Sequence, residues 1–396
     1  MKRIFLLVCL GLIVLASCRL EKNEIRVKVK NGSAMLRQNE TIELSRVDLG
    51  ITDVNLFAKL SVFNDASNQR ILSQLIDSDR DGINDAIIFQ PVVAAFSEVV
   101  FKISPTELAD TTTSKVFSRF VPERTDDYAW ENDKVAFRTY GPTAQKMVEE
   151  GIPGGTLSSG IDCWFKKVDY PVINKWYEKH TGGTGSYHKD TGEGYDPYHV
   201  GSSRGCGGLG FWEKDSLYVS KNFIAYKTLA NEPIRTEFEL DYADWQVAGR
   251  IIKEKKHISL DLGSNLMHVK AYIEGVDTIT LGITLHENMG ETNADTVNFC
   301  FSYWETIDNS ELGTGILVSP EYYLGYTKFV SPNKDQSQLL VHLKIINGSV
   351  EYYTGFGWKE SGQFNSFEAW KAYLQNYAMQ IQSPLDLEII KKQHIN

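Results

Sequence analysis

Apolar and polar residues alternate over much of this chain of 396 residues. Alternation with a period of two places the apolar side chains on one face of an extended strand and the polar side chains on the other. It is clearest in six stretches, at residues 25–30, 54–63, 217–226, 235–242, 268–273 and 339–346. The pattern predicts half-buried β-strands throughout the chain.

Helical patterns are few. The segments 143–150 and 173–178 are short helix candidates, and Gly151 ends the first of them. Ser366 begins a third candidate over 366–377, and its side-chain oxygen is of the kind favoured at a helix N-cap. No repeat of fixed period and no low-complexity tract interrupts the chain.

The strand content and the chain length favour a mainly β fold. We expect a large antiparallel β-sandwich with few short helices, of the supersandwich type that galactose-mutarotase-like proteins have. Residues 18–125 are expected to form an N-terminal β layer and residues 126–396 the main catalytic sandwich, with one continuous domain as the alternative. Carbohydrate enzymes often use such a scaffold, and the abundant aromatic residues (8 Trp, 19 Tyr and 19 Phe) agree with that use.

The first 18 residues have the pattern of a bacterial export signal. Two basic residues precede an apolar run over 4–14, which is shorter than the ~20 apolar residues of a transmembrane helix. Leu-Ala-Ser-Cys at 15–18 is similar to the lipobox of bacterial lipoproteins, in which the cysteine is lipidated. We therefore expect a signal peptide at 1–17, acylation of Cys18, and attachment to a periplasmic or outer-membrane surface. A plain signal peptide with an incidental cysteine is the alternative.

Acidic residues outnumber basic residues. The chain has 51 Asp and Glu against 41 Lys and Arg, a formal charge of −10, which falls to −12 without the two basic residues of the signal peptide. A surface of this sign disfavours nucleic-acid binding, although a local arginine pocket still accommodates an acidic substrate. Beyond Cys18 the chain keeps Cys163, Cys206 and Cys300, so we expect at most one internal disulfide.

The stretch 187–208 carries most of the ionisable candidates. Its glycines permit positive φ angles and close approach of the backbone to a ligand. The side chains that can exchange protons, pair with ions or bind hydroxyls are Tyr187, His188, Asp190, Glu193, Asp196, Tyr198, His199 and Arg204. A glycine-rich loop of this kind is a common place for a site, and a solvated loop without chemistry is the alternative.

Three kinds of chemistry fit this loop. The first is proton abstraction beside a sugar carboxylate, which requires a base, an acid and a cation that neutralises the carboxylate. The second is glycoside hydrolysis by Glu193 and Asp196, although carboxylates so close in one loop do not readily flank a bond from opposite sides. The third is a zinc or calcium site whose spacing matches no established motif. Its ligands would be His188, Asp190, Glu193, Asp196 and His199.

Further candidate substrate-binding residues lie outside this loop. Arg138 and Tyr140 share one face of an expected strand, and His286 ends another strand. Trp164 is a candidate platform for sugar stacking, and Trp358 is a candidate groove residue. Burial in the core is the competing interpretation for both tryptophans, and a structural role is the competing interpretation for His286.

Carboxylates alternate along the segment 77–85, which is similar to the Asp-rich calcium loops of secreted proteins. The candidate ligands are Asp77, Asp79, Asp81 and Asp85. The twelfth position is Ile88 rather than the bidentate glutamate of an EF-hand. The segment therefore predicts a structural calcium site, with a polar hairpin as the alternative.

Several runs of residues together resemble a known family. They are Trp-Glu-Asn-Asp-Lys-Val-Ala-Phe-Arg at 130–138, Ser-Gly-Ile-Asp-Cys-Trp at 159–164, Tyr-His at 187–188, Gly-Glu-Gly-Tyr-Asp at 192–196 and Ser-Arg-Gly-Cys-Gly-Gly-Leu-Gly at 203–210. The family consists of secreted bacterial proteins from polysaccharide-utilisation clusters and was long catalogued as a domain of unknown function. One member is an ulvan oligosaccharide dehydratase, which removes water from a terminal uronic acid and leaves a 4,5-unsaturated sugar. The resemblance covers most of the chain and implies a carbon–oxygen lyase reaction on an acidic oligosaccharide.

We therefore expect β-elimination of water from a uronic acid. Arg204, with Arg138, is expected to neutralise the uronate carboxylate. His188 would take the proton at C5, and Tyr198 or Tyr187 would protonate the departing hydroxyl. The two carboxylates at 193 and 196 would hold the histidine or the sugar hydroxyls. The chemistry needs no cofactor; a glycoside hydrolase and a glycan-binding lipoprotein without activity are the alternatives.

Overall fold

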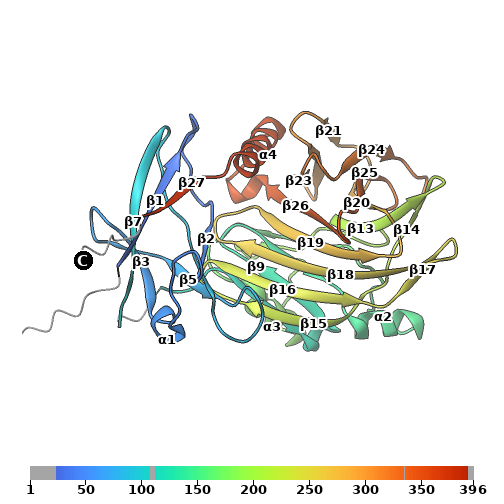
Figure 1. The fold of residues 1–396 in the computed structure, drawn as a ribbon. Helices are drawn as coiled ribbons and strands as arrows, with labels where there is room; N and C mark the ends of the chain where they lie inside the picture. Colours follow the sequence, from blue (N-terminus) through green and yellow to red (C-terminus); the bar gives the residue numbers. More distant parts are fainter. Residues whose placement is uncertain (1–23, 108–111, 334, 391–396) are drawn as a thin grey trace, which may run out of the picture.

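The computed structural model describes residues 24–107, 112–333 and 335–390. Most of the chain forms a large antiparallel β-sandwich, with a smaller N-terminal module beside it (Figure 1). The expected mainly β architecture with few helices is confirmed. No helix within the described ranges is long and apolar enough to cross a membrane. Cys18 and the expected signal peptide lie outside the described residues.

One layer of the sandwich is a nine-stranded antiparallel sheet. In order across the sheet, its strands are β15 (Phe223–Ala230), β16 (Arg235–Tyr242), β18 (Arg250–Asp261), β19 (Leu266–Glu274), β26 (Ser349–Trp358), β23 (Ser310–Val318), β22 (Cys300–Ile307) and β21 (Glu291–Asp295), and β17 (Trp245–Val247) pairs with β18. The alternating pattern decides which face each side chain takes. In β19, Met267 and Val269 are buried, whereas the intervening His268 and Lys270 face outward.

The opposite layer consists of two five-stranded antiparallel sheets. The first contains β12 (Gly194–Tyr195), β11 (Asp162–Lys166), β10 (Ala136–Thr139), β9 (Asp127–Glu131) and β8 (Phe117–Val121). The second contains β14 (Ser216–Tyr218), β13 (Cys206–Glu213), β20 (Thr278–Thr284), β25 (Gln338–Lys344) and β24 (Tyr323–Phe329). A parallel bridge between Ile161 and Gly205 links the two sheets at the starts of β11 and β13.

A single large hydrophobic cluster fills the space between the layers. It combines side chains of the nine-stranded sheet, such as Phe238 and Val269, with side chains of the opposite layer, such as Phe137 and Leu281. Complete burial of one such side chain contributes about 1.5–3 kcal/mol to folding. This core sets the positions of the strands and therefore of the polar residues on their outer faces.

The N-terminal module has its own core and two small sheets. The first sheet contains β27 (Asp386–Ile390), β1 (Ile25–Asn31), β7 (Ser97–Pro105), β3 (Leu60–Asn64) and β4 (Arg70–Ile71), and the second contains β2 (Ile42–Ser45), β6 (Ala86–Phe89) and β5 (Ser73–Ile76). Apolar side chains of both sheets, including Val27, Phe89 and Phe101, form a separate buried cluster. The last strand, β27, lies beside the first, β1, so the C-terminal segment belongs to this module (Figure 1).

The expected boundary at residue 125 does not match the sheets. Strand β8 precedes residue 125 but pairs with β9, in register from Phe117 opposite Glu131 to Val121 opposite Asp127, and so belongs to the sandwich. The module therefore ends after β7, and the strand at 386–390 returns to it.

Three helices occupy the positions expected from the sequence. The helices are α1 (Val54–Phe57), α2 (Pro142–Glu149), α3 (Ile173–Thr181) and α4 (Phe367–Gln382), and the short 3-10 helices are η1 (Pro122–Arg124) and η2 (Lys359–Ser361). Helix α1 was not expected, because the alternation over 54–63 predicts a strand; Asp53 accepts hydrogen bonds from the backbone N–H groups of Asn55 and Leu56 and starts a helix instead. The strand expected over 217–226 is likewise divided into β14 and β15.

Two helices cover outer faces of the sandwich. Helix α4 packs against β22 and β23, and its Trp370 donates a hydrogen bond to the backbone oxygen of Thr314 at 3.1 Å. Helix α3 packs through Trp176 and Tyr177 on the outer face of the sheet β8–β12. Cys163, Cys206 and Cys300 are buried and free, so these three cysteines form no disulfide.

Candidate functional site

Charged residues gather on the outer face of the sheet β8–β12, the face that does not contact the main core. Arg138 of β10 lies opposite Asp162 of β11 and opposite Ala129 of β9. Asp127 is two residues from Ala129 and therefore points to the same face. The neighbouring Phe137 points into the core. Strand alternation and register therefore bring three charged side chains together.

Arg138 is the centre of a buried ion network, which we call the Arg138 cluster. Its members are Asp127, Arg138, Asp162, Tyr187 and Asp196, and all five are buried. The guanidinium Nε donates to Asp162 Oδ2 at 2.7 Å, and Nη2 donates to Asp196 Oδ2 at 2.9 Å. Nη1 donates to the hydroxyl oxygen of Tyr187 at 3.0 Å and lies 3.6 Å from Asp127 Oδ2. Every nitrogen of this guanidinium therefore has a partner within the protein.

The three carboxylates of the cluster have perturbed acidity. Burial raises the pKa of Asp127 to about 6, although the positive charges of Arg138 and Arg124 oppose the shift. Burial also raises the pKa of Asp162, and burial together with the charge of Asp162 raises the pKa of Asp196 well above its usual value. Within the described ranges, the second oxygen of each carboxylate has no hydrogen-bond partner. Buried carboxylates with shifted pKa values and open acceptor positions are typical of functional sites.

Three nitrogen-bearing side chains, Arg124, His180 and His188, form the rim of the cluster. The side chain of His188 is 52% exposed, and its Nδ1 lies 2.8 Å from the backbone oxygen of Asp196 and 3.3 Å from Asp196 Oδ2. Arg124 Nε donates to the Tyr187 hydroxyl oxygen at 3.0 Å. The His180 ring stacks on Tyr187 with centroids 4.1 Å apart and lies 6.0 Å from the His188 ring. The rim residues therefore lie between the solvent and the buried Arg138 cluster and contact the cluster directly.

The backbone beside the rim is strained. Thr125 and Asp126 both have positive φ angles, 50° and 67°, in a region that residues other than glycine adopt at a cost of roughly 1–3 kcal/mol. Arg124 Nη1 donates to Thr125 Oγ1 at 2.8 Å, and Asp126 Oδ2 accepts from the backbone N–H of Thr143 at 3.1 Å. The strained pair turns the chain so that Arg124 and Asp127 face the same site.

Helix α3 closes the cluster from outside. Glu131 of β9 accepts a hydrogen bond from the backbone N–H of Ile173 at 2.8 Å and one from Lys166 Nζ at 2.7 Å. A carboxylate at this end of the helix satisfies N–H groups that have no partner inside the helix. Tyr177 of the same helix donates to Asp127 Oδ2 at 3.0 Å. The buried pair of Glu131 and Lys166 thus positions the helix that covers the site.

The structure brings five of the sequence-predicted residues together. Arg138, Tyr187 and Asp196 belong to the cluster, His188 lies on its rim, and Tyr140 donates its hydroxyl to Asp162 Oδ2 at 3.2 Å. Arg138 is not free to bind a substrate, because its nitrogens are engaged by these carboxylates and by Tyr187.

The expected role of Arg204 is wrong. Its side chain is 1% exposed, and Nη1 donates to Ser159 Oγ at 2.8 Å and to the backbone oxygen of Leu209 at 3.1 Å. Burial lowers its pKa to about 10, although the charge of Glu254 opposes the shift. A guanidinium enclosed in this way does not reach the carboxylate of an external sugar.

The two tyrosines proposed as acids are also enclosed. The hydroxyl oxygen of Tyr187 lies between the guanidinium groups of Arg124 and Arg138 and positions both. Tyr198 is buried against the edge of the His286 ring, with centroids 4.7 Å apart. Neither hydroxyl is at the surface, so both are structural side chains rather than proton donors to an external sugar.

Trp164 and Trp358 belong to the core. Trp164 packs under helix α3 against Trp176 and is fully buried. Trp358 is also buried, and its indole N–H donates to Ser310 Oγ at 3.0 Å. The stacking and groove roles are therefore wrong, and the competing interpretation of buried tryptophans is correct.

Glu193 and His286 are engaged away from the cluster. Glu193 Oε1 accepts from the hydroxyl of Tyr170 and from Lys175 Nζ, both at 2.6 Å. His286 has Nδ1 2.7 Å from Glu305 Oε1 and Nε2 3.0 Å from the backbone oxygen of His199. Both side chains are satisfied within the protein, so neither is placed to bind substrate.

The metal site considered as an alternative for the loop 187–208 is not assembled. Asp190 pairs with Lys167 at 2.6 Å, and His199 pairs with Asp335 at 3.0 Å, so these possible ligands point to different partners. In the part of the chain that the structure describes, one group of three His, Cys, Asp or Glu residues has ligand atoms mutually within 4.8 Å. That group is Asp77, Asp79 and Asp81.

The Asp-rich segment connects β5 and β6. Asp77 accepts hydrogen bonds from the backbone N–H groups of Arg80, at 2.8 Å, and Gly82, at 2.9 Å, so the turn is fixed by its own carboxylate. Asp85 instead accepts from the N–H and hydroxyl of Ser78 and is not part of the compact group. Asp79 and Asp81 are exposed and Asp77 is half-buried, and three carboxylate oxygens held this close together fit a hard cation such as calcium.

Sequence reasoning missed four residues of the site. They are Arg124, Asp127, Asp162 and His180. Asp127 and Asp162 carry a signal in the sequence, since each is a charged residue at the start of a strand whose three central residues are apolar or aromatic. Arg124 and His180 carry none, because the end of η1 and the end of α3 meet only in the folded chain.

Known proteins resemble this chain at the level of sequence and of fold. A protein of Formosa agariphila described as uncharacterized protein P7 is 44% identical over 384 residues, which cover 94% of this chain and 96% of that protein. Two structures from Enterococcus faecalis share the fold, each 11% identical over 94% of this chain: a protein in glycosyl hydrolase family 38, with a TM-score of 0.55, and an alpha-mannosidase, with a TM-score of 0.51.

This chain spans about half the length of the two solved proteins, 48% and 46% respectively. At this identity their likeness concerns the fold alone. The sequence match is more specific, because residues 29–387, nearly the whole described chain, match the family described as a domain of unknown function, DUF4861. The chain belongs to the DUF4861 family.

Proposed function

We propose that this protein is a carbohydrate-active enzyme that removes water from the terminal uronic acid of an oligosaccharide by β-elimination. The observation that carries the proposal is a half-exposed imidazole, His188, held by the buried Asp196 at the rim of a cluster of buried carboxylates. The fold shared with glycosyl hydrolase family 38 proteins supports a carbohydrate as the substrate class. The resemblance of the runs at 130–138 and 159–164 to those of an oligosaccharide dehydratase supports elimination as the reaction.

His188 is suited to act as the base. Its Nδ1 lies 2.8 Å from the backbone oxygen of Asp196, and a carbonyl oxygen only accepts hydrogen bonds. In the neutral ring, Nδ1 therefore carries the hydrogen and Nε2 carries the free lone pair. With 52% of the side chain exposed, Nε2 is available to a sugar at the surface.

Arg124 replaces Arg204 as the residue that neutralises the uronate. It is half-buried at the rim, and two of its nitrogens are fixed by Tyr187 and Thr125. The remaining Nη2 makes no hydrogen bond within the described ranges, so it is open to a carboxylate oxygen. A guanidinium beside the carboxylate lowers the cost of forming a carbanion at the adjacent carbon.

The elimination then balances without a cofactor. His188 Nε2 takes the proton at C5, the electron pair forms the C4–C5 double bond, and the bond from C4 to its hydroxyl breaks. The His188 imidazolium returns a proton to the departing hydroxyl, which leaves as water. Asp196 keeps the ring oriented through both steps and does not touch the sugar.

The geometry disfavours glycoside hydrolysis by Glu193 and Asp196. A hydrolase needs its two carboxyl groups on either side of one glycosidic bond, ~5–10 Å apart. Glu193 is held by Lys175 and Tyr170, whereas Asp196 is held by Arg138, and both carboxylates are buried. The two groups therefore serve different parts of the fold.

The test is an assay on a panel of oligosaccharides that end in glucuronate, iduronate or galacturonate. Ultraviolet absorbance reports an unsaturated uronate, and mass spectrometry reports the loss of one water. We expect His188→Gln to lower the rate about 10²–10⁴-fold, as removal of a general base does. Arg124→Gln is expected to lower the rate and to raise KM, since it removes the charge that holds the carboxylate.

His199→Gln is a matched control. Its side chain is 60% exposed and pairs with an aspartate, Asp335, at 3.0 Å, but this aspartate is not a member of the Arg138 cluster. We expect near-normal rates from this variant. Reducing ends without a double bond would instead indicate a hydrolase, and binding without any product would indicate a glycan-binding protein; either result overturns the proposal.

A further inference from the structure

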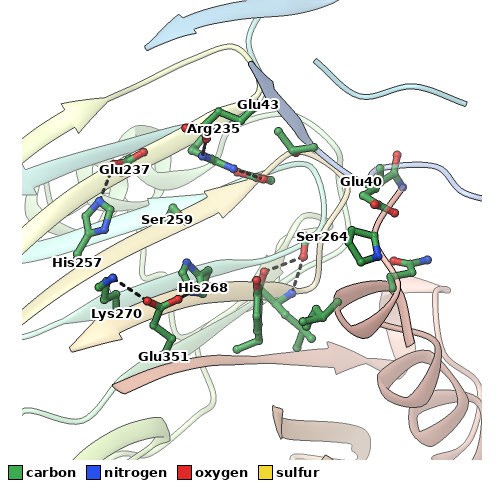
Figure 2. A pocket seen from close by; sticks show the side chains of 18 of the residues that line it. Glu40, Glu43, Arg235, Glu237, His257, Ser259, Ser264, His268, Lys270 and Glu351 are labelled. Atoms are coloured by element: carbon green, nitrogen blue, oxygen red, sulfur yellow. Dashed lines mark hydrogen bonds and ion pairs between the residues drawn. The ribbon is translucent and has the colours of Figure 1, made fainter. Parts of the chain in front are cut away.

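A cleft separates the N-terminal module from the outer face of the nine-stranded sheet, and we call it the module cleft. Its volume is about 560 Å³. The strands β2, β16, β18, β19 and β26 and the end of helix α4 contribute the side chains that line it (Figure 2). Pockets that bind small molecules usually have volumes of ~300–1,000 Å³. The module cleft is therefore large enough for a few sugar rings.

The floor of the cleft is a grid of polar side chains on neighbouring strands. His257 of β18 lies opposite Lys270 of β19, which in turn lies opposite Glu351 of β26. In the next row, Ser259 lies opposite His268. His257 and His268 are therefore diagonal neighbours on one sheet face, ~7–8 Å apart.

Each imidazole of the floor is paired with a carboxylate. His257 Nε2 lies 2.6 Å from Glu237 Oε1, and His268 Nε2 lies 3.5 Å from Glu351 Oε2. Lys270 Nζ lies 2.7 Å from the other oxygen of Glu351, and Figure 2 shows these groups pointing toward one another. Hydrogen bonding with His268 and Lys270 lowers the pKa of Glu351 to about 2, so this acceptor stays charged at neutral pH.

Aromatic rings border the same floor. The Tyr353 ring lies against His268 with centroids 4.7 Å apart, and Tyr377 of helix α4 contacts Tyr353 at 5.4 Å. Both tyrosines line the cleft. Flat rings beside paired donors and acceptors match the two faces of a sugar, one of C–H groups and one of hydroxyls.

The charge of the lining narrows the class of ligand. The residues that line the cleft include five carboxylates and three cations of fixed charge, besides the two histidines. A polyanion would meet an excess of negative charge, and a nucleic acid is excluded for the same reason. Among the described residues, no group that could hold a metal ion lies in the cleft. Neutral hydroxyl groups, which donate to carboxylates and accept from Lys and His, fit the lining best.

We propose that the module cleft is a second saccharide-binding site, which binds a neutral, hydroxyl-rich unit of an oligosaccharide and has no catalytic role. The proposal takes its ligand class from the proposed function but uses none of the same residues. The site recognises sugar units that lack a carboxylate, whereas the rim of the Arg138 cluster recognises the terminal uronate.

The junction of the two modules holds the cleft in shape. Arg235 Nη1 of the sandwich lies 3.0 Å from Glu43 Oε2 of the N-terminal module, and Arg235 also binds Asp261 through two parallel bonds of 2.7 and 3.0 Å. Gln74 of the module accepts hydrogen bonds from the backbone N–H groups of Ile234, at 2.9 Å, and Arg235, at 2.7 Å. A cleft held by such contacts is ordered before a ligand arrives, which lowers the entropic cost of binding.

The experiment measures binding calorimetrically in a His188→Gln background, which prevents turnover. The probes are neutral hexasaccharides of xylose, mannose and glucose, with a galacturonate hexamer as the acidic probe. We expect at least one neutral probe to bind with a stoichiometry of one. Glu351→Gln should weaken this binding about tenfold or more, because it removes a charged acceptor of sugar hydroxyls.

Glu274→Gln is the matched control. Glu274 of β19 pairs with Lys253 of β18 at 2.8 Å on the same face of the nine-stranded sheet, but neither residue lines the cleft. The control should bind as the parent does. The proposal would be overturned if no neutral probe binds, or if Glu351→Gln and Glu274→Gln lose the same affinity for the probe. Elimination measured with Glu351→Gln alone separates the two sites, since that variant is expected to keep its turnover while His188→Gln loses it.

Discussion

His188 and His199 show that a histidine's role depends on what lies behind it. Both are more than half exposed, both lie in one loop, and both pair with an aspartate. The partner of His188 is the buried Asp196, which belongs to a network of charges that water does not screen. The partner of His199, Asp335, is not a member of that network. At the residue scale, the candidate site is therefore defined by buried neighbours rather than by the histidine itself.

Replacing Arg138 tests the buried network. We expect Arg138→Met to destabilise the fold by about 3–5 kcal/mol, because it leaves three buried carboxylates without their cation. The loss should be smaller at pH 4 than at pH 8, since the raised pKa values of these carboxylates allow them to become neutral in acid. Denaturant unfolding of the wild type and of Arg138→Met at both pH values measures this loss of stability. The exposed ion pair between Lys253 and Glu274 offers a control, because Lys253→Met should lower the free energy of unfolding by only ~0–1 kcal/mol.

His286 makes a pH-dependent contribution to stability. Burial lowers its pKa, but the hydrogen bond and charge of Glu305 outweigh burial, and the pKa is raised from 6.5. A histidine with a raised pKa stabilises the fold fully below 6.5 and loses that contribution as the pH rises through the folded value. The difference in unfolding free energy between the wild type and His286→Asn should therefore be larger at pH 6 than at pH 9. A difference that does not change with pH would contradict this assignment.

Sequence reasoning found some of the site residues and not others. His188, Arg138 and Asp196 stand in motifs whose residue types point to acid–base chemistry, and the structure brings them together. Arg204 stands in an equally suggestive glycine-rich run, but the side chain turns into the core. The difference between a buried and an exposed arginine depends on packing from distant strands, and no local pattern reports it.

At the scale of elements, alternation predicts most strands, while local capping decides the exceptions. The stretch 54–63 reads as a strand, yet Asp53 caps a short helix over its first residues. Helix α4 was expected because Ser366 is a favourable N-cap, and its hydroxyl oxygen does accept from the backbone N–H of Ala369 at 3.3 Å. Propensity and capping are local properties, so the sequence carries them directly.

The turn between β5 and β6 is an element that a cation would stabilise. If calcium binds Asp77, Asp79 and Asp81, a concentration of 100 times its dissociation constant should stabilise the fold by about 2.7 kcal/mol. Thermal unfolding with added calcium and with a chelator measures the effect. Asp79→Asn should abolish the response, whereas Asp48→Asn, a change at an exposed aspartate outside the loop, should not. Equal thermal unfolding midpoints with added calcium and with a chelator would contradict the prediction.

At the scale of the whole molecule, the two modules are joined through backbone groups of β16. Gln74 is buried, and besides accepting from the N–H groups of Ile234 and Arg235 it donates to the backbone oxygen of Arg235 at 3.0 Å. The N-terminal module also includes the strand at 386–390, so both ends of the described chain meet there. The N-terminal module, which contacts β16 of the sandwich, thus consists of segments that are remote in sequence.

Gln74→Leu tests this junction. The change leaves two backbone N–H groups and one carbonyl without partners, at ~1–3 kcal/mol for each buried group. We expect a loss of several kcal/mol in denaturant unfolding and a weaker affinity of the module cleft for saccharide. Gln90→Leu should cost less, because Gln90 is only half-buried and donates only one short bond across the same junction, to the backbone oxygen of Leu262 at 2.8 Å. Equal effects of the two changes would show that burial at position 74 is unimportant.

By itself the sequence determined the strand pattern, three of the four α-helices in the described residues, the mainly β class and the chemical types gathered in the loop 187–208. All of these follow from spacing and composition along the chain. Only the tertiary structure decided that Arg124, Asp127 and His188 share one site while Arg204 lies in the core. The reason is physical: burial and ion pairing depend on strand register and on layers that approach from distant parts of the chain, and a linear pattern contains no information on those distances.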